Sequence, residues 1–92
     1  MTMTYTQFED EFIAASVIAA DSDSAANPRS HGVVDAFLVA RRVLPDVTDA
    51  WVRSAVESFE MRSWIFNVSR ALRGGIGFMI TGEGRRHAES LG

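Results

Sequence analysis

The chain has 92 residues and a formal net charge of −3, with 47% hydrophobic and 23% charged residues. This length and composition are typical of one small globular domain, because two separate cores would each be too small to offset the entropy of the chain. The sequence contains no cysteine, which excludes disulfides, thiolate zinc sites and cysteine nucleophiles and favours a cytoplasmic protein.

The charges are distributed unevenly along the sequence. Residues 1–40 hold six acidic residues and one arginine, whereas residues 41–92 hold six acidic residues and eight arginines. All nine basic residues are arginine, whose planar guanidinium group suits contacts with phosphate or carboxylate. The negative net charge nevertheless argues against a general binder of polyanions.

One apolar run, FIAASVIAA at residues 12–20, has the composition of a signal-peptide core. Glu9, Asp10 and Glu11 precede it, where a signal peptide requires basic residues. The run is also too short to span a bilayer. We therefore expect a cytoplasmic protein that does not contact a membrane.

Apolar side chains at steps of three and four predict a first helix over residues 4–20. Its apolar face would consist of Tyr5, Phe8, Phe12, Ala15 and Ala19. Thr6 and Glu9 have the Ser/Thr-x-x-Glu spacing of a capping box at the start of this helix. The segment DSDSAANPRS that follows is rich in Asp, Ser, Asn and Pro, which predicts an acidic surface loop over residues 21–31.

Two shorter helices follow the predicted loop. A short β-bridge leads into the first of them, residues 35–43, which ends before Pro45 because proline disfavours a helical conformation at the preceding residue. Thr48 or Asp46 can cap the next helix, expected over residues 48–62. The apolar residues at helical spacing in this helix are Val52, Ala55, Val56 and Phe59.

The remaining sequence predicts a β-hairpin and a closing helix. Residues 64–72 and 76–80 are rich in β-branched and aromatic residues, and the RGG sequence between them supplies the glycine that a tight turn needs. We expect the hairpin over residues 64–81 and the helix over residues 82–91. The expected core side chains of the whole chain are Phe8, Phe12, Phe37, Leu38, Val52, Val56, Phe59, Ile65 and Ile80.

The order of these elements resembles that of a winged helix-turn-helix domain. Residues 52–65, VRSAVESFEMRSWI, resemble the third helix of that family and its exit into the first wing strand. Residues 78–89, FMITGEGRRHAE, resemble the second wing strand followed by the family's LT.eGr..ae ending. The sequence departs from the family at Ser63, where a glycine is usual, and in the long acidic loop after the first helix. The resemblance implies one domain over residues 1–92, mainly α with a small β-hairpin.

The resemblance also implies a DNA-binding, transcription-regulator-like module. In such domains the third helix enters the major groove and the wing hairpin reaches a neighbouring groove or the backbone. By this analogy the candidate nucleic-acid-binding residues are Arg41, Arg42, Thr48, Arg53, Ser54, Asn67, Arg70 and Arg73.

A protein-protein interaction adaptor without DNA binding is the alternative. Asp46, Asp49 and Glu57 place negative charge on or beside the helix that would approach the phosphates. An adaptor could use Trp51 or Trp64 as an anchor for a partner protein. The alanine-rich first helix further allows a homodimer, because small residues permit another helix to approach closely.

Patterns that resemble catalytic or metal-binding motifs are incomplete. The GEG sequence at residues 82–84 lacks the third glycine of a dinucleotide fingerprint. The DSD sequence at residues 21–23 begins like a calcium loop, but the required glycine and glutamate do not follow it. His31 and His87 do not have metal-ligand spacing, and no GxSxG motif is present. We expect a non-enzymatic protein without catalytic residues, metal or cofactor.

Overall fold

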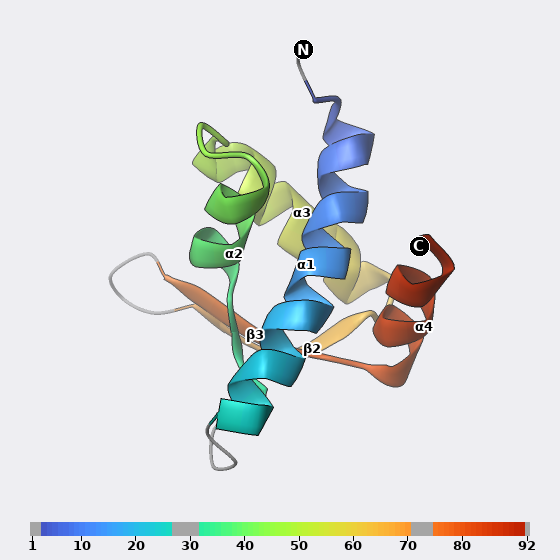
Figure 1. Ribbon diagram of the computed structural model, residues 1–92. Coiled ribbons are helices and arrows are strands. Elements are labelled where there is room, and N and C mark those ends of the chain that lie inside the picture. Colours follow the sequence, from blue (N-terminus) through green and yellow to red (C-terminus); the bar gives the residue numbers. More distant parts are fainter. Residues whose placement is uncertain (1–2, 27–31, 71–74, 92) are drawn as a thin grey trace.

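The computed structural model describes residues 3–26, 32–70 and 75–91. Its elements in chain order are α1 (Tyr5–Ala26), β1 (Val34–Asp35), α2 (Ala36–Val43), α3 (Asp49–Met61), β2 (Ile65–Arg70), β3 (Ile76–Ile80) and α4 (Gly82–Leu91). The protein is mainly helical, with a small antiparallel sheet of strand order β1-β3-β2. Helix α1 crosses the molecule with α2 on one side and α4 on the other (Figure 1).

Helix α1 differs from its prediction at both ends. The capping box is formed by Thr4 and Gln7, not by Thr6 and Glu9: the Gln7 amide donates to Thr4 Oγ1 at 3.1 Å and the Thr4 amide donates to Gln7 Oε1 at 3.0 Å. The helix then continues to Ala26, so the predicted loop is wrong over residues 21–26, while residues 27–31 lie outside the described part of the chain. A long-range contact accounts for the extension, because both carboxylate oxygens of Asp21 accept hydrogen bonds from Arg85 of α4 at 2.9 Å.

Helix α2 is rotated relative to the prediction. Asp35 caps it by accepting a hydrogen bond from the Leu38 amide at 3.2 Å. The core face is made of the small or β-branched residues Ala36, Val39 and Ala40. Leu38 is 50% exposed and Phe37 is half-buried, so the prediction that both lie in the core is wrong for Leu38 and only partly right for Phe37. The small side chains of Ala36 and Ala40 are fully buried, whereas Leu38 lines a surface pocket between α2 and α1.

Helix α3 has the predicted cap and lies within one residue of its predicted bounds. Thr48 accepts a hydrogen bond from the Trp51 amide at 3.2 Å, which satisfies one of the free amides of the first turn. Its buried residues are those that the helical spacing indicated, Val52, Ala55, Val56 and Phe59. The helix is thereby held in the core by one face while the opposite face remains exposed.

The hairpin and β1 form one sheet. Strand β3 pairs with β2 (Ile65↔Ile80 and Arg70↔Ile76) and with β1 (Val34↔Phe78). An irregularity in β2 coincides with Asn67, whose φ of 51° is a left-handed conformation that asparagine tolerates better than most residues. Strand β2 begins one residue later than the predicted segment 64–72, and residues 71 and 72 of that segment lie outside the described part of the chain. The predicted glycine turn also falls largely outside the described residues, since Gly74 is not among them.

The core contains predicted and unpredicted side chains. Phe8, Phe12, Val52, Val56, Phe59 and Ile65 are buried as predicted, whereas Ile80 is only half-buried. The core also contains side chains that the prediction omitted: Ile13, Val17, Val34, Val39, Ile76 and Phe78. Phe12 joins the layers, because its ring lies 5.6 Å from that of Phe59 in α3 and 6.2 Å from that of Phe78 in β3.

Candidate nucleic-acid interface

A pocket of about 420 Å³ lies where α2, α3 and the start of β3 meet. We call it the Phe37 pocket. The guanidinium carbons of Arg41 and Arg53 lie 5.5 and 5.6 Å from the centroid of the Phe37 ring, within the range of a cation-π contact. The side chains and backbone that line the pocket are Asp35, Phe37, Leu38, Arg41, Asp49, Arg53 and Gly75. The structure therefore brings two of the candidate arginines, from two helices, together beside the hairpin.

The two arginines of the Phe37 pocket differ in their ion pairs. Arg41 Nη2 lies 4.0 Å from Asp49 Oδ1, and both side chains are more than half exposed, so the contact is weak. Arg53 is exposed and forms no ion pair with any residue that the structure describes. Arg53 is thus the cation of this pocket that is most accessible to an incoming anion.

The neighbouring candidate Arg42 belongs to another surface. It is exposed in the last turn of α2 and lines a second pocket against the later part of α1, beside Asp23 and Asp35. A cation at this end of a helix is stabilised by the helix dipole. Arg42 extends the basic end of α2 but does not point into the Phe37 pocket.

The two hydroxyl candidates on α3 already form hydrogen bonds within the protein. Thr48 caps the helix through its Oγ1. Ser54 Oγ accepts a hydrogen bond from the Tyr5 hydroxyl at 2.9 Å, which ties α3 to the start of α1. Burial, together with a hydrogen bond to Glu9, raises the pKa of Tyr5, so its hydroxyl stays protonated and able to donate at neutral pH. Each hydroxyl oxygen thus accepts one hydrogen bond within the protein, while its own O–H group can still donate.

The exposed face of α3 carries more acidic than basic residues. Asp49, Glu57 and Glu60 are exposed on it, against the single arginine Arg53. Glu60 Oε1 accepts a hydrogen bond from Arg70 Nη2 at 2.7 Å, so the wing strand β2 is linked to α3 by this ion pair. Arg70, which was expected to contact phosphate, is therefore engaged by Glu60. The two residues lie ten positions apart in different elements, so no local sequence pattern predicted this ion pair.

Of the other two wing candidates, only Asn67 lies in the described part of the chain. Asn67 is exposed, and its Nδ2 donates to Met79 Sδ at 3.6 Å across the hairpin. Arg73 lies outside the described residues. The described part of the wing therefore presents Asn67 and the paired Arg70.

Both tryptophans pack against their own chain. The Trp51 ring lies 5.3 Å from Tyr5 and 5.6 Å from Phe8. The Trp64 ring stacks on His87 of α4, with centroids 3.9 Å apart and an angle of 18° between the planes. Each is half-buried. An adaptor would need exposed anchor side chains, so these half-buried tryptophans are weak candidates for contacting a partner protein.

The described residues contain no group of three or more His, Asp or Glu side chains that could hold a metal ion. Within the same residues, no helix combines the length and apolar character needed to cross a bilayer.

No protein-family model matches the sequence, and no curated protein or solved structure is significantly similar to it. The arrangement of the side chains therefore carries the functional argument.

Proposed function

We propose that the protein is a winged helix-turn-helix module that binds duplex DNA, with α3 in the major groove and the β2–β3 hairpin against the backbone. The order of the elements and the strand order β1-β3-β2 support this proposal. A helix of the size of α3 fits the major groove of B-DNA. The observation that carries the proposal is the Phe37 pocket, where Arg41 and Arg53 stand together beside the hairpin.

The Phe37 ring is in contact with two guanidinium groups, which supports phosphate binding at this pocket. Arg41 and Arg53 each lie within cation-π range of the ring. A phosphate bound at the pocket can accept charge-assisted hydrogen bonds from a guanidinium group. Such phosphate contacts would position α3 in the major groove, where its other exposed side chains would contact the bases.

The footprint on DNA is small. Arg41 and Arg53 are the arginines that line the Phe37 pocket, Arg42 lies on another surface, and Glu60 occupies Arg70. Two phosphate contacts predict a log-log dependence of affinity on salt with a slope of about −2 per protomer. We therefore expect weak binding to random duplex that is detectable at low salt.

Anisotropy of a labelled random duplex at about 50 mM salt tests the proposal, because electrostatic binding is strongest there. Arg53→Ala should weaken binding and flatten the salt slope by about one unit. Arg86→Ala is the matched control, since Arg86 is also exposed and without an ion pair in the described residues but belongs to α4. Equal losses in the two variants would contradict the assigned site.

A second variant uses the ion pair between α3 and the wing. Glu60→Gln removes a negative charge from the proposed interface and releases Arg70, so affinity for the random duplex should rise and the salt slope should steepen. An unchanged affinity in Glu60→Gln would show that this face does not approach phosphate.

The adaptor remains the second candidate because the exposed face of α3 is acidic. Asp49, Glu57 and Glu60 would repel phosphate, and they suit a basic protein surface instead. An adaptor predicts no binding to random duplex even at about 50 mM salt, and no gain on Glu60→Gln. This outcome would replace the DNA-binding proposal.

A further inference from the structure

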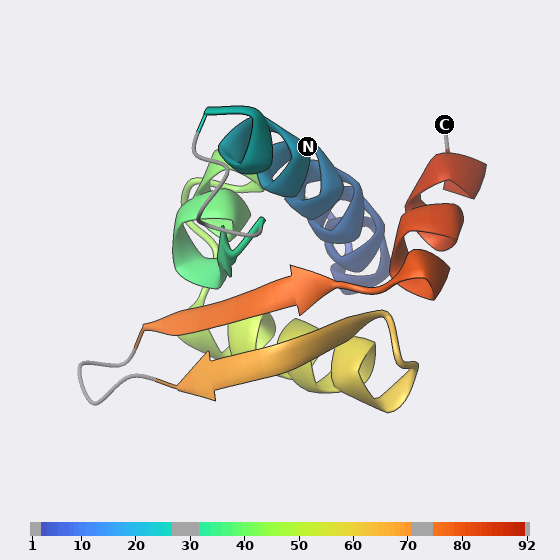
Figure 2. The same cartoon turned by 90° about the horizontal axis from the view of Figure 1, so that it is seen from below.

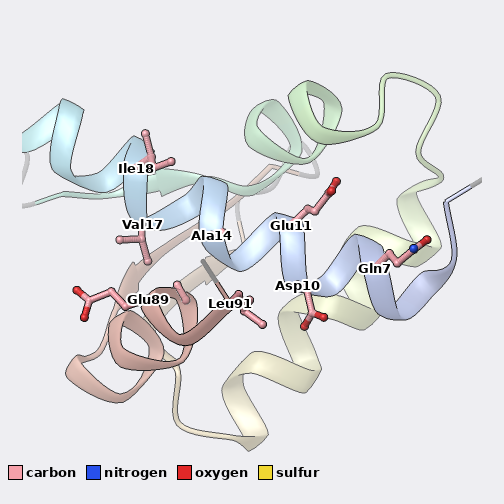
Figure 3. A pocket seen from close by; sticks show the side chains of 9 residues that line it. Gln7, Asp10, Glu11, Ala14, Val17, Ile18, Glu89 and Leu91 are labelled. Carbon is pink, nitrogen blue, oxygen red and sulfur yellow. The ribbon is translucent and has the colours of Figure 1, made fainter.

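A groove of about 570 Å³ lies between α1 and α4, away from the Phe37 pocket. We call it the α1–α4 groove. Figure 3 shows the side chains that line it, which project from these two helices. Its apolar lining consists of Ala14, Val17, Ile18, Ala88 and Leu91, and its polar lining of Gln7, Asp10, Glu11 and Glu89. The surface of the groove is mainly apolar carbon.

Two large aliphatic side chains of the groove are exposed to solvent. Ile18 is 68% exposed and Leu91 is 43% exposed. Exposed apolar side chains that share one concave surface, with polar residues around it, are typical of interaction sites. Covering them would remove apolar area from water, which favours an aliphatic occupant.

The charges around the groove limit the kind of occupant. Three carboxylates line it, and no lysine or arginine does. His87 Nε2 lies 3.9 Å from Asp10 Oδ1. Glu11 is exposed and forms no ion pair within the described residues, and Glu89 is exposed and interacts electrostatically with Arg85 of α4. An occupant with cationic groups beside its apolar face would be attracted.

The same charges disfavour two other occupants. A second copy docked symmetrically would bring the three carboxylates of each groove against those of the other, and like charges across an interface are costly. An anionic membrane surface would be repelled for the same reason. The charges of the groove thus favour a basic partner protein over a second copy of the chain and over an anionic membrane.

We infer that the α1–α4 groove binds an amphipathic helix of another protein, one whose aliphatic stripe is flanked by arginine or lysine. A helix presents side chains on one face at steps of three and four, which matches an elongated groove between two helices. The aliphatic stripe would cover Ile18 and Leu91, and the basic flanks would meet Glu11 and Glu89.

The groove is independent of the proposed DNA-binding face. Gly75 in the Phe37 pocket precedes β3, and α4 follows the opposite end of that strand (Figure 2). Five residues of β-strand span about 17 Å. The inference does not rest on DNA binding, and each can fail without the other.

Two labelled helical peptides of equal length test the inference. Both carry leucine at positions i, i+3, i+4 and i+7; one has a polar face of lysine and arginine and the other of glutamate. Anisotropy with the full protein should show the basic peptide binding at least tenfold more tightly. Ile18→Ser should weaken its binding at least fivefold, while Met61→Ser, a change of an 87% exposed residue on α3, should leave it unchanged.

A charge reversal tests the basic flanks separately. Glu89→Lys should reduce the preference for the basic peptide, while Glu57→Lys, the same change on α3, should alter it much less. Absence of binding by the basic peptide, or equal loss in the groove and control variants, would overturn the inference. Sedimentation of the protein alone as a dimer that Ile18→Ser dissociates would also overturn it, in favour of a second copy as the occupant.

Discussion

Gly84 shows how one residue position joins two elements. It is buried at the start of α4, and a Cβ on it would overlap the carbonyl oxygen of Trp64. Its amide donates to Thr81 Oγ1 at 3.0 Å, and the same hydroxyl donates to the Ser63 carbonyl oxygen at 2.6 Å. The threonine and the glycine of the TGEG sequence therefore have a structural role, which is to seat α4 against the link between α3 and β2.

This contact predicts the effect of Gly84→Ala. Although alanine favours a helix by about 1 kcal/mol, the added methyl group would push against backbone, and such overpacking costs about 1–3 kcal/mol or more. We expect a net loss of stability, measured as a lower midpoint of urea unfolding.

Gly82→Ala is the control for that measurement. A Cβ there would meet only the flexible end of Arg86, at 3.6 Å, so this variant should be as stable as the parent or slightly more stable. If Gly84→Ala unfolded at the same urea concentration as Gly82→Ala, the close contact between Gly84 and the Trp64 backbone would be contradicted.

At the scale of elements, the last part of α1 depends on a distant helix. Asp21 and Arg85 are separated by 64 positions in the sequence, yet they form two hydrogen bonds of 2.9 Å. The Arg85 guanidinium group lowers the pKa of the Asp21 carboxyl group, mainly through these hydrogen bonds. The pair holds the end of α1 beside α4, next to the α1–α4 groove.

The lowered pKa gives a defined dependence of stability on pH. Since Asp21 binds protons more weakly in the folded than in the unfolded state, its contribution is present above the unfolded pKa of about 3.9 and is lost as pH falls through the folded value. Asp21→Asn should thus lower stability at pH 7 by less than about 1 kcal/mol, because both side chains are partly exposed. Urea unfolding at pH 7 and at successively lower pH measures this difference, which should shrink below about pH 4.

The control for Asp21→Asn is Glu57→Gln, which neutralises an exposed carboxylate without an ion pair in the described residues. It should change stability less than Asp21→Asn does. A loss in Asp21→Asn that stayed constant from pH 7 to acid would show that the carboxylate acts by some means other than its charge.

At the scale of the whole molecule, the Phe37 pocket includes Gly75, just before β3, whereas α4, which lines the α1–α4 groove, follows the other end of that strand (Figure 2). The Phe37 pocket is lined by two arginines and two aspartates, whereas the α1–α4 groove is lined by three carboxylates and no arginine. The two surfaces therefore differ in charge. The two proposed ligands, DNA and a basic helix, would not compete for one surface.

This separation predicts that variants of the two surfaces act independently. Ile18→Ser should leave affinity for the random duplex within about twofold, and Arg53→Ala should do the same for the basic peptide, because distant sites without shared partners are usually additive. The two anisotropy assays measure this directly. A large effect of either variant on both ligands would show that the surfaces are coupled or overlap.

The amino-acid sequence determined the elements whose signals are local. Thr48 caps α3 through an amide three residues away, the apolar spacing from Val52 to Phe59 selects the buried face, and the β-branched and aromatic strands around a glycine-rich turn favour a hairpin. These signals act over a few residues, so they could be predicted without knowledge of the fold. The candidate arginines of α2 and α3 came instead from the resemblance to a winged helix-turn-helix domain, which places these helices at the DNA.

Only the tertiary structure decided which of those residues are available and where α1 ends. Asp21 lies within α1 and is held there by Arg85 of α4, and Ala36, Val39 and Ala40 are buried in α2 while Leu38 is exposed. Arg70 is paired with Glu60, and Ser54 with Tyr5, 49 positions away. Each outcome depends on groups far apart in the chain meeting in space, where hydrogen bonding, ion pairing and packing outweigh the local preferences that a sequence displays.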